Sequence, residues 1–380
     1  MDVERARQVR RRIVRLAQSG LGSSVLVEKV EPLLRAVIPF DRACWHNVDP
    51  ATSMLTSVLG DSAPTSPLLP VLEYGTRDVN QYSDLARGPV NAAGLRAVTR
   101  DMPCSSRRYR EILQPIQVED ELTASFVIDS TFWGCARLYR SARWPAFDAV
   151  EIAFVASLAA PLAQGFRTAL LRSAGAVHSE PEGPGLVLLN GDGTLASVSP
   201  AAERWLSEVI DDMPVEGAPL PRPLLAVASR ARAIADDGLA GLLARCRVPT
   251  RSGRWLVLHG EQVQVAGEDR VSVIVEPAPA VEIAPLIACA YGLTGREQQV
   301  MRCVLHGMAN KEIAQALGLS PYTVSDHVRL IFEKVGVHSR TELAARVFFE
   351  HCYPRMAGAS AIGTDGWFVE APGGERWLRG

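Results

Sequence analysis

Closely spaced helix signals between Leu293 and Glu350 constrain the fold of this chain more than any other feature. Thr294 and Glu297 have the spacing of a capping box, in which each side chain caps the backbone N–H of the other residue. Gly307 follows a run with helical periodicity and is placed to end that helix. A first helix is therefore predicted just after Leu293.

Three further helix starts follow at short intervals. Asn310 is placed to cap a second helix. Ser320 is placed to cap a third, with Pro321 at its first position, where a missing N–H has no cost. Ser339 and Glu342 form another capping box and predict a fourth helix. The segment is predicted to be an all-α unit of four short helices.

The second and third helices have the spacing of a helix-turn-helix. Ala314 is small enough for two helices to cross closely, and Gly318 lies where a positive φ is needed. Val324 is placed to fill the shared core. The other residues predicted for that core are Ile313, Leu317, Leu319 and Val328.

The third helix has two faces at a period of 3.6 residues. The apolar face consists of Val324, Val328, Ile331 and Val335. The polar face consists of Tyr322, Ser325, Asp326 and Arg329. An exposed polar face on a capped helix behind a glycine turn is what a recognition helix presents to the major groove of DNA.

The stretches "LTGRE", "GMANKEIAQALGLSPYTVSDHV" and "IFEKVGVHSRTEL" together resemble the LuxR-type helix-turn-helix domain over its full length. The resemblance implies that Lys311 and Thr323 contact phosphates and that positions 325, 326 and 329 face bases. Ser325 stands where that family frequently has Lys, so the chain departs from the family pattern at one usual phosphate or guanine contact. The residues expected to contact DNA are Lys311, Ser320, Tyr322, Thr323, Ser325, Asp326, His327 and Arg329. The resemblance also implies that the fourth helix supports a homodimer through Leu343, Val347 and Phe348.

Asp326 is an unexpected residue on a surface that meets a polyanion. Two roles are open for it: it accepts a hydrogen bond from cytosine N4, or it orients Arg329 one helical turn away. Either role trades general affinity for selectivity.

Two Pro- and Gly-rich seams, "HSEPEGPG" from His178 and "EPAPAVEIAP" from Glu276, divide the rest of the chain. The predicted parts are an N-terminal helix (1–21), two sensory domains (22–172 and 183–278), a linker (279–292), the helix-turn-helix domain (293–350) and a C-terminal tail (351–380). Trp367, Phe368 and Trp377 in the tail could dock on a neighbouring surface.

The first sensory part contains two predicted hairpins, which turn at Asp49–Thr52 and at Asp129-Ser130. A helix with apolar periodicity follows and is predicted to kink at Pro161. The phrases "PFDRACWHNVDPATSMLT" and "DELTASFVI…WGCARLYR" resemble GAF domains, which implies an α+β sensor. Trp45, Trp133 and Tyr139 are candidates for lining a ligand pocket, although aromatic residues in hairpins more often belong to the core. Cys135 is expected to be a buried, inert thiol.

The second sensory part starts with a strand, an Asn-Gly-Asp-Gly turn, a second strand and a helix capped by Ser199 with Pro200 at its first position. Further strands are predicted within "CRVPTRSGRWLVLHGE" and "DRVSVIVEP". This order resembles a PAS domain and implies a second α+β sensor.

Composition and motifs exclude other classes of protein. The 380 residues carry 40 Lys and Arg against 42 Asp and Glu, which excludes a polybasic tail. The seven cysteines form no Cys-x-x-Cys, so neither a zinc site nor a disulfide framework is expected. No phosphate loop, nucleophile elbow or kinase motif set is present, so no catalytic residue and no cofactor are predicted. The N-terminus predicts an amphipathic helix and no signal peptide, and the protein is expected to be cytoplasmic with no membrane contact.

The sequence therefore predicts a multidomain, non-enzymatic transcription regulator with GAF-like and PAS-like sensors and a LuxR-type helix-turn-helix. Its partners are expected to be double-stranded DNA, a second copy bound through the C-terminal helix and sensory domains, and a small-molecule effector. The alternative is a ligand-binding adaptor that uses the helix-turn-helix to dock on another protein.

Overall fold

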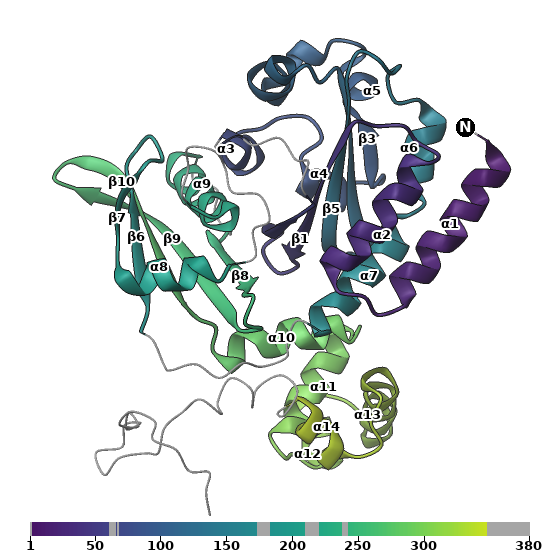
Figure 1. The fold of residues 1–380 in the computed structure, drawn as a ribbon. Helices are drawn as coiled ribbons and strands as arrows, with labels where there is room; N and C mark the ends of the chain where they lie inside the picture. The colour runs from purple at the N-terminus through teal and green to yellow at the C-terminus, as the bar shows by residue number, and fades with distance from the viewer. Residues whose placement is uncertain are drawn as a thin grey trace, which may run out of the picture.

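The structure is a computed structural model that describes residues 2–60, 66, 68–172, 183–209, 220–237 and 242–347. Two sheet-containing domains are followed by a helical domain, and α10 lies among all three (Figure 1). The chain is thus organised as the mixed, multidomain architecture that the sequence predicts. The predicted tail and Phe348 lie outside the described residues.

The first domain is built on an antiparallel sheet of order β2-β1-β5-β4-β3. Its strands are β1 Arg42–Asp49, β2 Met54–Leu59, β3 Ala92–Gly94, β4 Asp120–Ile128 and β5 Thr131–Arg140. Its helices are α1 Val3–Gln18, α2 Ser23–Arg35, α3 Leu68–Tyr74, α4 Tyr82–Arg87, α5 Leu95–Thr99, α6 Ala149–Ala156 and α7 Ala159–Arg172, with short 3₁₀ or π turns at Pro103–Ser105, Tyr109–Leu113 and Gln114–Ile116.

Both predicted hairpins of this domain are confirmed. Asp129 and Ser130, the turn between β4 and β5, both have positive φ, at 50° and 58°. A two-residue turn with positive φ at both positions matches the twist of the flanking strands. In the β1–β2 turn the Asp49 carboxylate accepts a hydrogen bond from the Ala51 N–H at 3.0 Å.

Helices cover both faces of the first sheet (Figure 1). On one face α1, α2 and α7 bury Trp45, Phe126 and Phe166 in the largest apolar cluster of the described structure. Because α1 packs into this cluster, the N-terminal helix is part of the first domain. The other face is covered by α3, α4 and α5.

The predicted kink at Pro161 is a break that separates α6 from α7 one turn earlier, at Ser157 and Leu158. The proline ring clashes with the carbonyl four residues before it, which here belongs to Ser157. The stretch Ala149–Leu171 is long and apolar enough to cross a membrane, but half of its apolar window is buried inside the protein. The packing of α7 on the sheet accounts for that apolarity.

The second domain repeats the topology of the first. Its sheet has the order β7-β6-β10-β9-β8, which is the same sequence of connections as in the first sheet. The elements are β6 Gly185–Leu189, β7 Leu195–Val198, α8 Pro200–Ser207, α9 Arg222–Asp237, β8 Arg245–Pro249, β9 Trp255–Val265 and β10 Glu268–Pro277. Ser199 caps α8 with Pro200 at the first position, as predicted.

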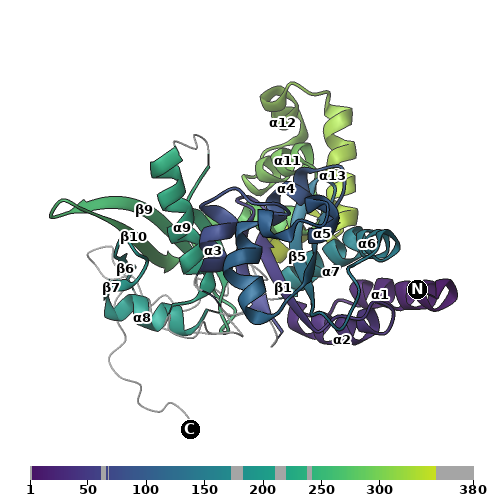
Figure 2. The ribbon, with the colours of Figure 1, turned by 90° about the horizontal axis from the view of Figure 1, so that it is seen from above.

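The two sheet domains share an interface that α9 dominates. This helix packs on its own sheet and also against β2 and α3 of the first domain. Figure 2 shows α9 beside α3. Met54 and Tyr74, both from the first domain, are buried in the core cluster of the second. The two domains are therefore packed together and are not joined only by a tether.

The segment predicted as a linker contains a packed helix, α10 (Ala280–Ala290). Ile283, Leu286 and Ile287 of α10 lie in the apolar cluster of the first domain, together with Trp255 of β9. Ala288 of the same helix lies in the core of the helical domain. One helix thus contributes side chains to both the sensory part and the C-terminal domain.

Candidate nucleic-acid interface

The C-terminal domain consists of α11 Gly295–Leu305, α12 Asn310–Leu317, α13 Pro321–Val335 and α14 Arg340–Arg346. The predicted capping box of Thr294 and Glu297 is present on α11. The Glu297 carboxylate also accepts a hydrogen bond from Lys334 Nζ at 2.6 Å, which ties α11 to the end of α13. Lys334 and the cap hydrogen bonds lower the pKa of Glu297 even though burial opposes the charge.

The turn between α12 and α13 has the predicted helix-turn-helix geometry. Gly318 has a φ of +64° and ends α12 in the left-handed conformation. The Leu319 N–H then donates to the Ala314 carbonyl at 2.9 Å. Ala314, Ile313 and Val324 are buried in one core cluster, with Leu317 and Leu319 packed against it. The turn therefore holds α13 at a fixed angle to α12.

Helix α13 begins as predicted. The Ser320 hydroxyl accepts from the Thr323 N–H at 3.0 Å and contacts the Thr323 hydroxyl at 2.8 Å. Pro321 occupies the first helical position. These contacts fix the N-terminal turn of α13, where a recognition helix contacts base edges.

The two predicted faces of α13 are confirmed. Val324, Val328, Ile331 and Val335 are buried. Tyr322 is 77% exposed, and Ser325 and Arg329 are exposed as well. Asp326, His327 and Thr323 are partly exposed, and Lys311 and Ser320 are exposed. All eight residues expected to contact DNA are thus accessible; their contacts with DNA remain predictions.

Arg329 is not oriented by Asp326. Its Nη1 lies 2.7 Å from Glu333 Oε1, one turn further along α13, and both side chains are about 60% exposed. The structure therefore does not support the role in which Asp326 orients Arg329. The role in which Asp326 accepts a hydrogen bond from cytosine stays a prediction. An exposed pair at this spacing contributes only about 0.3–0.5 kcal/mol, so Arg329 can exchange Glu333 for a DNA partner at little cost.

The start of α12 differs from the prediction by one residue. Ala309 occupies the N-cap position, and its N–H donates to the Glu312 carboxylate at 2.6 Å. Asn310 is instead the first helical residue. Its Nδ2 donates to Ser325 Oγ at 2.9 Å, and its Oδ1 accepts from Arg340. The sequence predicts a cap at Asn310 because asparagine is strongly preferred at the N-cap position.

Arg340 is a structural residue that the sequence did not identify. Besides binding Asn310, it donates from Nη1 to the Met308 carbonyl at 2.6 Å. Asn310, Ser325 and Arg340 form a polar chain that joins the starts of α12 and α14 to the recognition helix. Since these residues are far apart in sequence, no local pattern could have paired them.

Two of the three predicted dimer contacts, Leu343 and Val347, are not available to a partner. Leu343 is fully buried and Val347 is 5% exposed, and both lie in the core of the domain itself. Side chains buried in one subunit are not available to a second. The exposed positions on α14 include Thr341 and Ala344.

The three aromatic residues considered for a ligand pocket do not share one cavity. Trp45 is buried between sheet and helices, where its Nε1 donates to Glu31 at 3.1 Å. Trp133 lines a cavity between the two sheet domains. Tyr139 lines a second cavity, on the other face of the first sheet.

The second cavity contains a buried histidine held in its neutral form. Burial, with the nearby charges of Arg222 and Arg137, lowers the pKa of His46 to about 3. His46 Nδ1 is 3.3 Å from the Ser57 carbonyl, so this nitrogen carries the proton. Nε2 then accepts from the Cys44 thiol at 2.9 Å. Burial also raises the pKa of the Cys135 thiol on the same sheet face, as expected of an inert thiol.

Within the described part of the chain, His, Cys, Asp and Glu do not gather in groups that could hold a metal ion. The candidate nucleic-acid interface is the exposed face of α13, opposite its buried valines and isoleucine.

Residues 292–347 match the family described as "Bacterial regulatory proteins, luxR family". Among curated proteins, the transcriptional regulatory protein UhpA of Escherichia coli is 54% identical over 56 residues, which are 15% of this chain and 29% of UhpA. The nitrate/nitrite response regulator protein homolog of Haemophilus influenzae is 45% identical over 58 residues, 15% of this chain and 27% of that protein. The chain thus spans less than a third of the length of these relatives.

Solved structures similar to this chain are more distant in sequence. The GAF domain of the cyanobacteriochrome TePixJ is 16% identical, with a TM-score of 0.27 over 35% of this chain and 81% of that domain. The VqmA–ligand–DNA complex of Vibrio cholerae is 14% identical, with a TM-score of 0.21 over 44% of this chain and 84% of the other.

Proposed function

We propose that this chain, whose residues 292–347 form a helix-turn-helix domain of the luxR family, is a transcriptional regulator that binds double-stranded DNA. The exposed face of α13 carries the proposal. It is polar, accessible and fixed by a glycine turn, while the opposite face of the same helix is buried. This arrangement suits insertion of α13 into the major groove.

In the proposed complex, Lys311 and Thr323 bind phosphates at either side of the groove. Ser325, Asp326 and Arg329 face base edges. Arg329 suits a guanine, which offers two acceptors to a guanidinium, and Asp326 suits the amino group of a cytosine. Ser325 is held by Asn310 and therefore positions the helix as much as it contacts DNA.

The salt dependence of DNA binding tests this proposal. We would select an operator from random duplexes with the full chain and measure affinity across a range of salt concentrations. Loss of one phosphate contact in Lys311→Ala should reduce the slope of log affinity against log salt by about one unit. Arg10→Ala, on the exposed face of α1, is the charge-matched control and should leave the slope unchanged.

A ligand-binding adaptor that docks on another protein is the second candidate function. The near balance of charges over the whole chain, 40 basic against 42 acidic residues, keeps it open. An adaptor would bind duplex DNA without salt dependence or not at all, whatever residue stands at position 311. The same titration therefore separates the two functions.

The sensory domains are proposed to control promoter binding by a homodimer. One domain with a near-balanced charge binds DNA weakly, and two domains on adjacent half-sites gain affinity. Because Leu343 and Val347 serve the core of the C-terminal domain, the dimer would use the exposed side of α14 and the sensory domains. Sedimentation of the full chain with and without operator DNA tests this. A regulator of this kind would act in the cytoplasm and without catalysis.

A further inference from the structure

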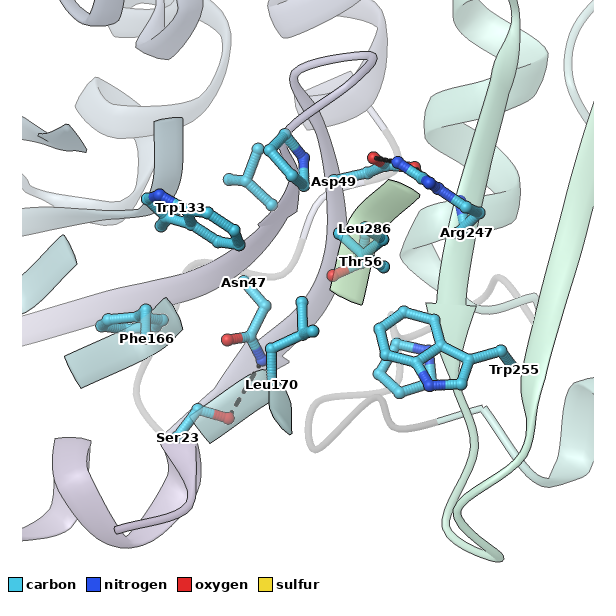
Figure 3. Close-up of a pocket in the computed structure, with 13 residues that line it drawn as sticks. Ser23, Asn47, Asp49, Thr56, Trp133, Phe166, Leu170, Arg247, Trp255 and Leu286 are labelled. Atoms are coloured by element: carbon cyan, nitrogen blue, oxygen red, sulfur yellow. Dashed lines mark hydrogen bonds and ion pairs between the residues drawn. The ribbon is translucent and has the colours of Figure 1, made fainter. Parts of the chain in front are cut away.

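A cavity lies where the first domain, the second domain and α10 meet (Figure 3). It encloses about 410 Å³ of space free of protein atoms, part of it open to solvent. Trp133 of β5 and Trp255 of β9 stand on opposite sides, with Leu170 of α7 and Leu286 of α10 between them.

Two irregularities in the first sheet direct side chains to this cavity. The register of β4 with β5 pairs Phe126 with Gly134 and then Val127 with Phe132, so Trp133 is left out of the ladder. The register of β1 with β2 leaves out Thr56 in the same way. A bulge re-aims the extra residue, and bulges are common beside functional sites. Both extra residues line the one cavity.

Gly134 supports the first of these bulges. A Cβ at this position would lie 2.8 Å from Phe166 Cδ1 and 3.0 Å from the His46 carbonyl oxygen. Phe166 also lines the cavity. The glycine therefore lets the aromatic wall approach the sheet.

The walls of the cavity are aromatic and apolar, and two of their N–H donors have no hydrogen-bond partner among the described residues. Trp133 and Trp255 are each 3% exposed, and neither Nε1 has a hydrogen-bond partner among the residues that the structure describes. Indole N–H groups only donate, and a buried donor without an acceptor is unfavourable. The hydroxyl groups of Ser23 and Thr56 and the amide of Asn47 add polar atoms to the same lining.

The charges at the cavity are already paired. Arg247 donates from its backbone N and from Nε to Asp49 Oδ2, both at 2.9 Å, and from Nη1 to the Glu282 carbonyl at 2.8 Å. Arg247 and Asp49 are the charged residues that line the cavity. A charged ligand would find no free counter-ion there and would lose its hydration, which disfavours it.

We propose that this three-way cavity binds a small, uncharged, largely aromatic or apolar molecule with a carbonyl-type hydrogen-bond acceptor. The ligand contacts Leu286 of α10. Ala288 of the same helix belongs to the core of the C-terminal domain. Binding therefore shifts the packing of α10, and with it the affinity of α13 for DNA. This last step rests on the proposed function, whereas binding itself does not.

The test uses the full chain and prodan, a neutral naphthalene with a propionyl carbonyl whose fluorescence reports burial. We expect saturable binding of one prodan per chain. Leu170→Trp, which fills the cavity from α7, should weaken binding about tenfold or more. Ala226→Phe fills the other cavity and is the matched control, with unchanged affinity expected. Thermal unfolding checks that both variants fold.

The proposed hydrogen-bond acceptor on the ligand is tested separately. 2-Dimethylaminonaphthalene lacks the propionyl carbonyl and should bind more weakly than prodan. Trp133→Phe and Trp255→Phe keep an aromatic wall but lose an N–H, and at least one should weaken prodan binding by about three- to tenfold. Equal affinity for the two probes in every variant would overturn the claim that a ligand carbonyl accepts a hydrogen bond from an indole N–H of this cavity.

The site as a whole is overturned if prodan fails to saturate, if Leu170→Trp binds like the original chain, or if only Ala226→Phe loses binding. Coupling is measured as the change in operator affinity on adding prodan, present in the original chain and absent in Leu170→Trp. If the chain binds prodan but no DNA under any condition, the ligand site stands and the proposed function fails.

Discussion

Asp49 and Arg247 form a buried ion pair that joins the two sheet domains across 198 positions of sequence. Asp49 ends β1 and is 2% exposed, and Arg247 in β8 is 7% exposed. The same arginine binds the Glu282 carbonyl of α10, and Arg245 beside it pairs with the Glu282 carboxylate at 2.6 Å. The pair thus fixes both the domain interface and the start of the helix that leads to α11.

Asp49→Asn should destabilise the chain and loosen this interface. The amide keeps the size of the carboxylate but leaves the Arg247 charge buried without a counter-ion, and breaking such a pair costs about 3–5 kcal/mol. Urea unfolding should report this loss, and proteolysis should cut the chain more readily between the domains. Glu4→Gln, in an exposed pair with Arg7, is the control, with a change within about 0.5 kcal/mol. Equal stability of the two variants would contradict the prediction.

The parts of the fold that were predicted correctly depend on local signals. The turn at Asp129-Ser130 follows from residues that tolerate positive φ, and the start of α13 follows from Ser320 and Pro321. The faces of α13 follow from its period, because Val324 and Val328 recur at helical spacing. Each of these features is determined by residues within a few positions of one another.

The features that were missed depend on distant contacts. In the sequence, Arg247 looks like an ordinary strand residue, and its pairing with Asp49 depends on contact between the two domains. Arg340 looks like a solvent-exposed cation, and its bond to Asn310 forms because Asn310 is not the N-cap of α12. The segment 279–292 was predicted as a linker because prolines punctuate it, yet Leu286 and Ile287 find apolar partners in the first domain. For the cavity, the sequence identifies Trp133 as a pocket candidate but not Trp255 opposite it, because the two residues come from separate domains.

His46 gives the chain a pH-dependent stability. Its pKa is about 3 in the folded chain against 6.5 when unfolded, because burial and the Arg222 and Arg137 charges oppose protonation. Below pH 6.5 the unfolded chain binds a proton that the folded chain does not. The stabilisation is therefore complete above pH 6.5 and is lost progressively as the pH falls toward 3.

His46→Gln should remove this dependence. Between pH 7 and pH 5 the contribution of His46 falls by about 2 kcal/mol, at 1.36 kcal/mol per pH unit below 6.5. Urea unfolding at both pH values should therefore show a smaller pH effect in His46→Gln than in the original chain. His306→Gln, at an exposed position, should retain the full effect. The prediction fails if both variants respond to pH as the original chain does.

Gly318→Ala should destabilise the α12–α13 turn by about 1–2 kcal/mol, because its φ of +64° is unfavourable for a residue with a Cβ. No atom lies within 4 Å of a Cβ built there, so the penalty is one of backbone conformation and not of space. Gly318→Asn should cost less, since asparagine tolerates this conformation. Hydrogen exchange of α12 and α13 would measure both losses. Equal protection in the alanine variant and the original chain would show that the turn is not strained.

Asp326→Ala should raise nonspecific DNA binding and reduce discrimination at one base pair. Asp326 is partly exposed on the α13 face, and Arg329 is paired with Glu333, so the carboxylate is free to accept from a cytosine. Without this carboxylate, the helix repels DNA phosphates less and makes one base contact fewer. Such a contact contributes about 1–3 kcal/mol of discrimination against the wrong base. Affinities for the selected operator, for single-base variants of it and for random duplex would measure both effects. Glu268→Gln, exposed in β10, removes the same charge far from α13 and should leave the ratio of specific to nonspecific affinity unchanged. An unchanged ratio in Asp326→Ala as well would mean that Asp326 reads no base.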